Sequence, residues 1–78
     1  MLPLDQLRPG QRGFIEALPS DGPTAQRLME MGLLEGEEIE VVGFAPLGDP
    51  VEVRLRDSRL SLRRREAARI RVQVLSGR

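Results

Sequence analysis

The sequence predicts a mainly β fold: a small β-barrel of about five short strands, with one α-helix inserted between strands 1 and 2. Two observations support this prediction. Apolar and polar residues alternate with a period of two along several stretches, as expected for strands that bury one face. Turn residues divide these stretches at intervals of about 8–12 residues, a spacing typical of small barrels and sandwiches. Closing the sheet would also remove exposed edges, which a domain of 78 residues has few other elements to cover.

The amino-terminal part is predicted to hold a helical turn and the first strand. Residues 2–7 fit one short helical turn. Residues 11–18 fit a strand, in which Gly13 marks a weak point or a bulge. The loop that follows is rich in proline and small polar residues, and Thr24 at its end is the expected N-cap of the helix.

The best helix candidate covers residues 25–31. Leu28 and Met31 are three positions apart and therefore share one face. Gly32 can adopt the left-handed conformation that ends a helix without a steric penalty. Met29 and Met31 diverge by roughly 200° around the helix axis, so their sulfur atoms are poorly placed to bind one metal ion. We therefore expect Met31 to pack in the core.

Four more strands are predicted after the helix. They cover residues 38–44, 51–56, 59–63 and 69–74. Asp57 and Ser58 are expected to form the tight turn between the second and third of these strands. Residues 63–69 fit a short helical turn or a bend, and residues 76–78 are expected to form a frayed end.

Apolar positions on one face of each strand supply the predicted core. These positions are Ile15, Ile39, Val41, Val51, Val53, Leu55, Leu60, Leu62, Ile70 and Val72. On the outer face, Glu38 and Glu40 are expected to lie across from Arg54 or Arg56. Cross-strand pairs of opposite charge contribute about 0.2–1 kcal/mol each.

The charges are unevenly spread along a chain whose net charge is zero. Residues 1–50 carry three arginines against nine acidic residues, and residues 51–78 carry nine arginines against three. We expect the two halves to pair within the folded domain, because the arginines alternate with apolar residues. The alternative is a basic face for nucleic acid or anionic lipid.

The composition argues against an enzyme and against a bound cofactor. The sequence has no cysteine, histidine or lysine, so its serines have no partner base, and the common zinc ligands are missing. The acidic run Glu35, Glu37, Glu38 and Glu40 could offer oxygen ligands, but metal binding is the weaker interpretation. No apolar run reaches the roughly 18 residues of a membrane span. The absence of cysteine fits a reducing compartment, so the expected location is the cytoplasm.

Two apolar surfaces are candidates for contact with another protein. The loop at residues 43–50 carries four apolar residues in a row, at a position where exposure is the default. These residues either fold back over an end of the barrel or form a docking tip. The second surface consists of the predicted helix face and the residues that follow, which are Leu28, Met29, Met31, Leu33 and Leu34.

Three segments carry a resemblance to a known family. They read LDQLRPGQRGFIEAL, RLMEMGLLEGEEIEVVGFAPLGDPVEVRL and LSLRRREAARIRV. The matching positions, in order and spacing, are Leu4, Leu7, Gly10, Arg27, Leu28, Gly32, Leu33, Gly36, Pro46, Gly48, Asp49, Pro50, Arg65, Glu66, Ala67 and Ile70. Over about residues 4–74 the chain resembles the FeoA family, small cytoplasmic proteins of bacterial ferrous iron uptake.

The resemblance implies an SH3-like β-barrel with an inserted helix, as a single domain over residues 1–78 with its core at about 4–75. It also implies a non-enzymatic accessory role through contact with FeoB, the membrane iron transporter that carries a cytosolic GTP-binding domain. The expected contact residues are Arg27, Leu28, Met31, Pro46, Leu47 and Gly48. Weak self-association is left open, and neither nucleic acid binding nor membrane insertion is expected.

Three alternatives remain open at this point. Similar SH3-like domains regulate iron-dependent repressors, although this chain has no DNA-binding helix-turn-helix before the domain. A metal-sensing domain is the second alternative. The third is a small barrel that binds nucleic acid through exposed arginines, namely Arg59, Arg63, Arg64, Arg69 and Arg71.

Overall fold

The computed structural model describes residues 1–75, so the end predicted to fray at residues 76–78 lies outside the described residues. The elements are β1 (Leu2–Pro3), the 3-10 helix η1 (Leu4–Gln6), β2 (Arg12–Ala17), α1 (Gly22–Glu30), β3 (Glu38–Phe44), β4 (Val51–Leu55), β5 (Ser58–Leu62), α2 (Arg64–Ala67) and β6 (Arg71–Val74). The predicted mainly β fold is therefore confirmed, including the helix between the first long strand and the second.

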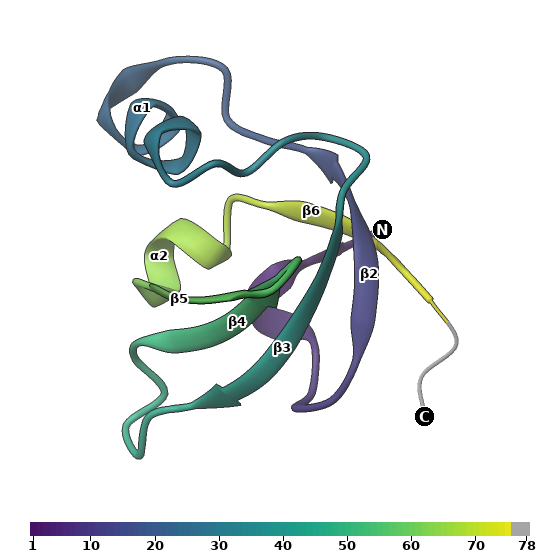
Figure 1. Cartoon of the computed structure of the whole chain (residues 1–78). Helices are drawn as coiled ribbons and strands as arrows, with labels where there is room; N and C mark the ends of the chain where they lie inside the picture. The colour runs from purple at the N-terminus through teal and green to yellow at the C-terminus, as the bar shows by residue number, and fades with distance from the viewer. Residues whose placement is uncertain (76–78) are drawn as a thin grey trace.

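The described strands form one antiparallel sheet in the order β1-β6-β2-β3-β4-β5. The sheet curls strongly, with α1 above one end of it and α2 between β5 and β6 (Figure 1). Six strands are present rather than about five, because the two-residue strand β1 adds to the edge of β6. Within residues 1–75 no ladder joins β1 to β5, so the barrel is open there, whereas the sequence suggested full closure.

The core lies inside the curled sheet and follows the predicted alternation. Every predicted core residue is buried except Leu60, which is partly buried and packs against the others. The helices and loops supply further core residues, namely Leu4, Leu7, Leu28, Leu33 and Ala67. Period-two alternation could not identify this second group, because none of its members lies on a long strand.

Helix α1 starts earlier than the sequence indicated. Its N-cap is Asp21, in extended conformation, and Gly22 is the first helical residue. Pro23 occupies the first turn, where its missing N–H costs nothing. The prediction of Thr24 as the N-cap is therefore wrong, because Thr24 already lies within the helix.

The end of α1 matches the predicted stop at Gly32. This residue has a φ of +89°, and its N–H donates to the carbonyl oxygen of Met29 at 2.9 Å. The N–H of Leu33 reaches back to the carbonyl oxygen of Leu28 at 3.2 Å. This pair of bonds is a Schellman motif, in which a left-handed glycine lets the chain turn back on the last helical carbonyls.

Two other local predictions need correction. The amino-terminal segment 2–7 is not one helical turn, because Leu2–Pro3 is extended and pairs with β6 before the 3-10 helix begins. The β4–β5 turn consists of Arg56 and Asp57, since Ser58 already pairs with Leu55. Arg56 has a φ of +56°, an uncommon conformation for a residue with a side chain.

Gly13 lies where β2 passes close to β6. A Cβ atom at this position would come within 2.7 Å of the carbonyl oxygen of Gln73. The register between the two strands shifts between Ile15 and Ala17 rather than at Gly13. The predicted bulge is thus displaced, and glycine is required here by the close approach of the two backbones.

We therefore expect Gly13→Ala to lower the free energy of unfolding by about 1–3 kcal/mol, because the methyl group forces the strands apart. Gly43→Ala in β3 is the matched control, since nothing lies within 4 Å of its Cβ position. This control is expected to be neutral or to stabilise by up to about 1 kcal/mol. Urea unfolding followed by circular dichroism measures both changes, and equal midpoints would contradict the packing argument.

Candidate functional site

The hairpin tip, residues 45–50 between β3 and β4, is held by its own backbone. The N–H of Ala45 donates to the carbonyl oxygen of Pro50 at 3.0 Å, and that of Gly48 donates to Ala45 at 2.7 Å. Gly48 has a φ of +86°, which suits glycine. Near the apex, the side chain of Leu47 is 96% exposed. The tip therefore presents an apolar side chain on a defined turn.

Arg64 at the start of α2 braces the tip from the side. Its backbone N–H donates to Asp49 Oδ1 at 3.0 Å, and its Nε lies 3.4 Å from Asp5 Oδ2. Its guanidinium carbon lies 5.7 Å from the centre of the Phe44 ring, within range of a cation–π contact. A Cβ on Gly48 would come within 2.6 Å of the Arg64 Nη1. One arginine thus connects the tip to α2 and to η1.

The tip combines both arrangements considered for this loop from the sequence. Phe44 is partly buried and packs against the core, as it would if the loop folded back. Pro46 and Leu47 are exposed, as they would be in a docking tip. Gly48 is partly buried beside Arg64. Three of the predicted contact residues are therefore accessible, in whole or in part.

Helix α1 buries Leu28 of the predicted contact set and exposes Met29, which belongs to the apolar surface predicted from the sequence. Leu28 is 1% exposed and belongs to the core, so it cannot present its side chain to a partner, and this part of the predicted contact set is wrong. Met31 is partly buried against the core. Met29 is 70% exposed and is the large apolar side chain that the helix offers to solvent.

Arg27 on α1 forms an ion pair with Glu66 on α2. Its Nε lies 2.5 Å from Oε2 of Glu66, whose side chain is only 5% exposed. The other oxygen of Glu66 accepts a hydrogen bond from the backbone N–H of Arg63 at 2.9 Å, so the carboxylate also caps the start of α2. The side chain of Arg27 is still 46% exposed. Sequence reasoning gave Glu66 no role, although it is the lone acid in an arginine-rich segment beside apolar Ala67 and Ile70.

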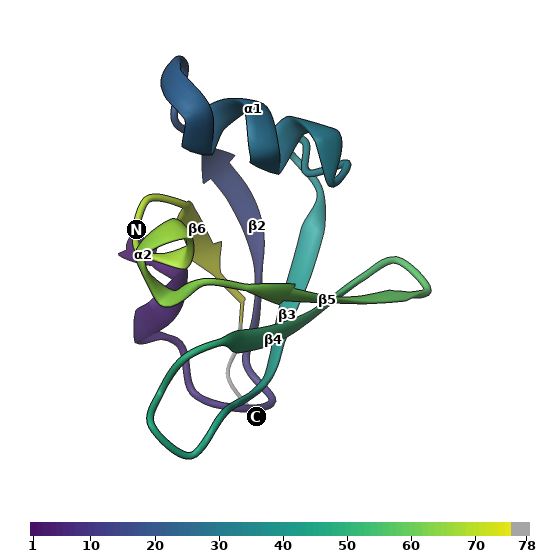
Figure 2. The ribbon, with the colours of Figure 1, turned by 90° about the vertical axis from the view of Figure 1, so that its left-hand side faces the viewer.

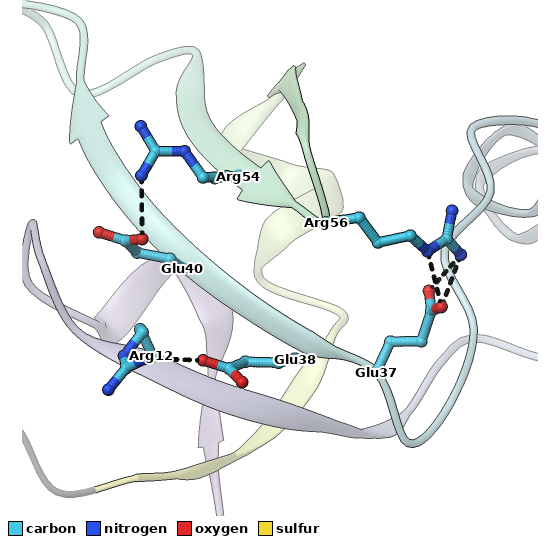
Figure 3. Close-up of a pocket in the computed structure, with 6 residues that line it drawn as sticks. All are labelled: Arg12, Glu37, Glu38, Glu40, Arg54 and Arg56. Carbon is cyan, nitrogen blue, oxygen red and sulfur yellow. Dashed lines mark hydrogen bonds and ion pairs between the residues drawn. The ribbon is translucent and has the colours of Figure 1, made fainter.

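A row of ion pairs covers the outer face of β2, β3 and β4 (Figure 3). Arg12 Nη1 lies 3.0 Å from Glu38 Oε2, and Arg54 Nη1 lies 3.3 Å from Glu40 Oε1. The predicted pairing of Glu40 with Arg54 is confirmed. Glu38 pairs instead with Arg12 on β2, a partner that the sequence analysis did not consider. Exposed pairs of this kind contribute at most about 1 kcal/mol each. The charges on this face are therefore largely neutralised within the domain.

The strained turn residue Arg56 also belongs to this row. Its Nη2 lies 2.6 Å and 2.7 Å from the two carboxylate oxygens of Glu37, and its Nε donates to Glu37 at 2.9 Å. The same Nη2 reaches the carbonyl oxygen of Gly32 at 3.4 Å. The bidentate contact ties the β4–β5 turn to the residue before β3, and the bond to Gly32 ties it to the end of α1. Together these contacts give the left-handed arginine a structural reason.

Of the ion pairs formed within residues 1–75, those of Arg27, Arg54, Arg56 and Arg64 join the acidic first part of the chain to the basic second part. The expected pairing of the two halves is confirmed for these residues. The other arginines named for a nucleic-acid surface are exposed; they are Arg59, Arg63, Arg69 and Arg71.

The described residues do not resemble a metal centre. Within residues 1–75, no three side chains of the histidine, cysteine, aspartate or glutamate type gather closely enough to hold an ion. Glu37, Glu38 and Glu40 each face an arginine instead. No helix in this part of the chain is long and apolar enough to span a bilayer.

The two predicted contact regions lie apart. In two views that differ by a rotation about the vertical axis, α1 stays at the top and the hairpin tip at the bottom (Figures 1 and 2). The domain measures 33 × 27 × 23 Å. The helix face and the hairpin tip, which the sequence analysis named as two candidate surfaces, therefore lie at opposite ends of the domain.

Comparison with known structures defines the class of domain. An FeoA-like protein from Clostridium acetobutylicum superposes with a TM-score of 0.90 at 34% identity, over 99% of this chain and 90% of that chain. Stenotrophomonas maltophilia FeoA, a procaryotic SH3 domain protein complexed with zinc, superposes with a TM-score of 0.74 at 30% identity, over 94% of this chain and 91% of that chain. A manganese-dependent transcriptional repressor superposes with a TM-score of 0.86 at 17% identity, over 95% of this chain and 41% of that chain. At this low identity the similarity shows a shared fold alone. The chain is thus an SH3-like domain.

Sequence comparison identifies the family. The FeoA domain model matches residues 2–74, so the chain belongs to the FeoA family. A Porphyromonas gingivalis Fe(2+) transport protein A/Fe(2+) transporter FeoB fusion protein is 41% identical over 73 residues, which is 94% of this chain. The chain spans 9% of the length of that relative. The family is one of accessory proteins in ferrous iron transport and is not a known enzyme family.

The geometry at Glu66 predicts a large effect of a single arginine. Arg27→Ala should lower the free energy of unfolding by about 1–3 kcal/mol, because it leaves a buried carboxylate with one backbone hydrogen bond. Arg12→Ala is the control, since it breaks an exposed ion pair expected to contribute less than about 1 kcal/mol. Urea unfolding measures both, and a loss for Arg12→Ala as large as that for Arg27→Ala would contradict the structural role of Glu66.

Proposed function

We propose that this protein is a non-enzymatic accessory of ferrous iron uptake that acts by direct contact with a FeoB-type membrane transporter. The contact is made in the cytoplasm, with the transporter's GTP-binding domain. The observation that carries the proposal is the fusion relative, which joins a matching domain to a FeoB transporter in one chain.

Fusion supports contact on physical grounds. Two parts of one chain meet at an effective concentration that can reach the millimolar range, so even a weak interface between them is occupied. A separate chain of the same family must reach its partner by diffusion and needs an accessible binding surface. The preformed surface that best meets this need is the hairpin tip.

The hairpin tip suits a partner anchor because it is already ordered. Leu47 is almost fully exposed, yet the turn that carries it is fixed by backbone bonds and by Arg64. A side chain held in its bound geometry loses little conformational entropy on association, which favours affinity. We place Pro46, Leu47 and Gly48 at this contact. Arg27 and Met31 remain candidates at the separate α1 surface through their accessible parts.

Leu47→Ser should weaken binding to the purified cytosolic domain of the transporter by at least about tenfold, which corresponds to about 1.4 kcal/mol. Phe14→Ser is the matched control, because Phe14 is also a partly exposed apolar residue, at 41%, but lies on β2. Biolayer interferometry with the immobilised domain gives both dissociation constants. If the wild-type protein does not bind, the proposed function is wrong. If both variants bind like the wild type, the assignment to the tip is wrong.

A further inference from the structure

A hollow of about 440 Å³ lies beside α1, next to the loops that connect this helix to β2 and β3. We call it the α1 groove. Its lining is mainly apolar and consists of Leu18, Pro19, Ser20, Ala25, Met29, Leu33, Leu34 and Glu35. Residues from both sides of α1 in the sequence thus meet in one concave surface.

The α1 groove contains large apolar side chains that the domain leaves uncovered. Met29 is 70% exposed and Leu34 is 55% exposed, whereas Ala25 and Leu33 are buried. Covering exposed apolar surface contributes about 25 cal/mol per Å² of favourable free energy to binding. The unbranched side chain of methionine adapts to different partner shapes. These properties are typical of a protein-binding groove.

The charge around the α1 groove is acidic and uncompensated. Glu35 lines the groove, and Asp21 and Glu30 line an adjoining hollow that shares Ala25 and Met29 with it. Within residues 1–75, none of these three acids forms an ion pair, and no arginine lines either hollow. Glu30 accepts a hydrogen bond from the neutral side chain of Gln26 at 3.4 Å.

The acidic residues of the sheet face show the opposite behaviour. Glu37, Glu38 and Glu40 follow Glu35 closely in the sequence, yet each of them faces an arginine. Among the described residues, one acidic cluster is therefore neutralised and the other has no arginine partner. An open acidic rim around an apolar floor is complementary to a segment that combines apolar and basic residues.

We propose that the α1 groove binds a short apolar polypeptide segment of the transporter that is flanked by lysine or arginine. The apolar side chains cover Met29 and Leu34, and the basic flanks face Asp21, Glu30 and Glu35. The acidic rim disfavours nucleic acid and anionic lipid, both of which carry like charge. The choice of the transporter as the source of the segment rests on the proposed function; the chemistry of the segment does not.

Two pairs of substitutions separate the apolar and the electrostatic parts of this site. Met29→Ser with Leu34→Ser should weaken binding to the transporter's cytosolic domain at least about tenfold, mainly through faster dissociation. Glu30→Gln with Glu35→Gln should slow association several-fold at low salt and flatten its salt dependence. The controls are Phe14→Ser and Glu52→Gln, which change an exposed apolar and an exposed acidic residue that do not line either hollow. Unchanged unfolding midpoints establish that the variants are folded.

A probe peptide tests the chemistry of the groove without the transporter. A short fluorescent peptide of leucine and lysine should bind the wild-type protein in an anisotropy assay, and its leucine and glutamate counterpart should not. The Met29→Ser/Leu34→Ser variant should lose this binding. Equal binding of both peptides, or no loss in the variant, overturns the proposal even if the transporter binds elsewhere.

The remaining outcomes distinguish this proposal from the proposed function. Binding of the basic peptide in the groove, combined with no binding of the transporter domain, rejects the proposed function and the transporter as the source of the segment. If Leu47→Ser weakens binding of the transporter and the α1-groove variants do not, the result supports the hairpin tip as the contact. The same result overturns the α1 groove as a transporter site. Sedimentation that shows a dimer lost in Met29→Ser/Leu34→Ser assigns the groove to a second copy of this chain and also overturns the proposal.

Discussion

A single buried carboxylate, that of Glu66, fixes both helices of this domain. One oxygen caps α2 through the N–H of Arg63, and the other binds Arg27 on α1. Within residues 1–75, Glu66 is the buried charged side chain of the core. A buried charge is stable only while it is paired and hydrogen-bonded. The position of α1 above the sheet and the position of α2 between β5 and β6 are therefore coupled through Glu66. The α1 groove and the brace of the hairpin tip depend on these two positions.

The distribution of charge then separates structural surfaces from candidate contact surfaces. Arginines neutralise the acids on the outer face of the sheet and hold the strained turn at Arg56 to the end of α1. Within residues 1–75, no arginine forms an ion pair with the acids around Met29. A surface whose charges are already paired offers little selectivity toward a partner, so the unpaired acids favour the surface around Met29 as a candidate contact.

Much of the fold could be predicted because it follows from local rules. Alternation identified the strands, since side chains of a strand point to opposite faces, and glycine identified the end of α1. The N-cap was placed wrongly at Thr24, because Asp21 and Pro23 give an equally good start one turn earlier. Strand β1 was missed because a strand of two residues is too short to show an alternation of apolar and polar side chains. Leu28 was assigned to a contact surface because the sequence shows which residues share a helix face but not which face the core covers.

The sequence by itself determined the strand pattern, the inserted helix, most of the core and the resemblance to the FeoA family. The tertiary structure decided which residues remain available to a partner. It buried Leu28, exposed Met29, tied Arg27 to Glu66 and separated the hairpin tip from α1. The physical reason is that exposure and ion pairing are set by contacts between segments distant in the chain. Arg27 and Glu66 lie far apart in the chain, and they meet because the curled sheet brings α1 and α2 together.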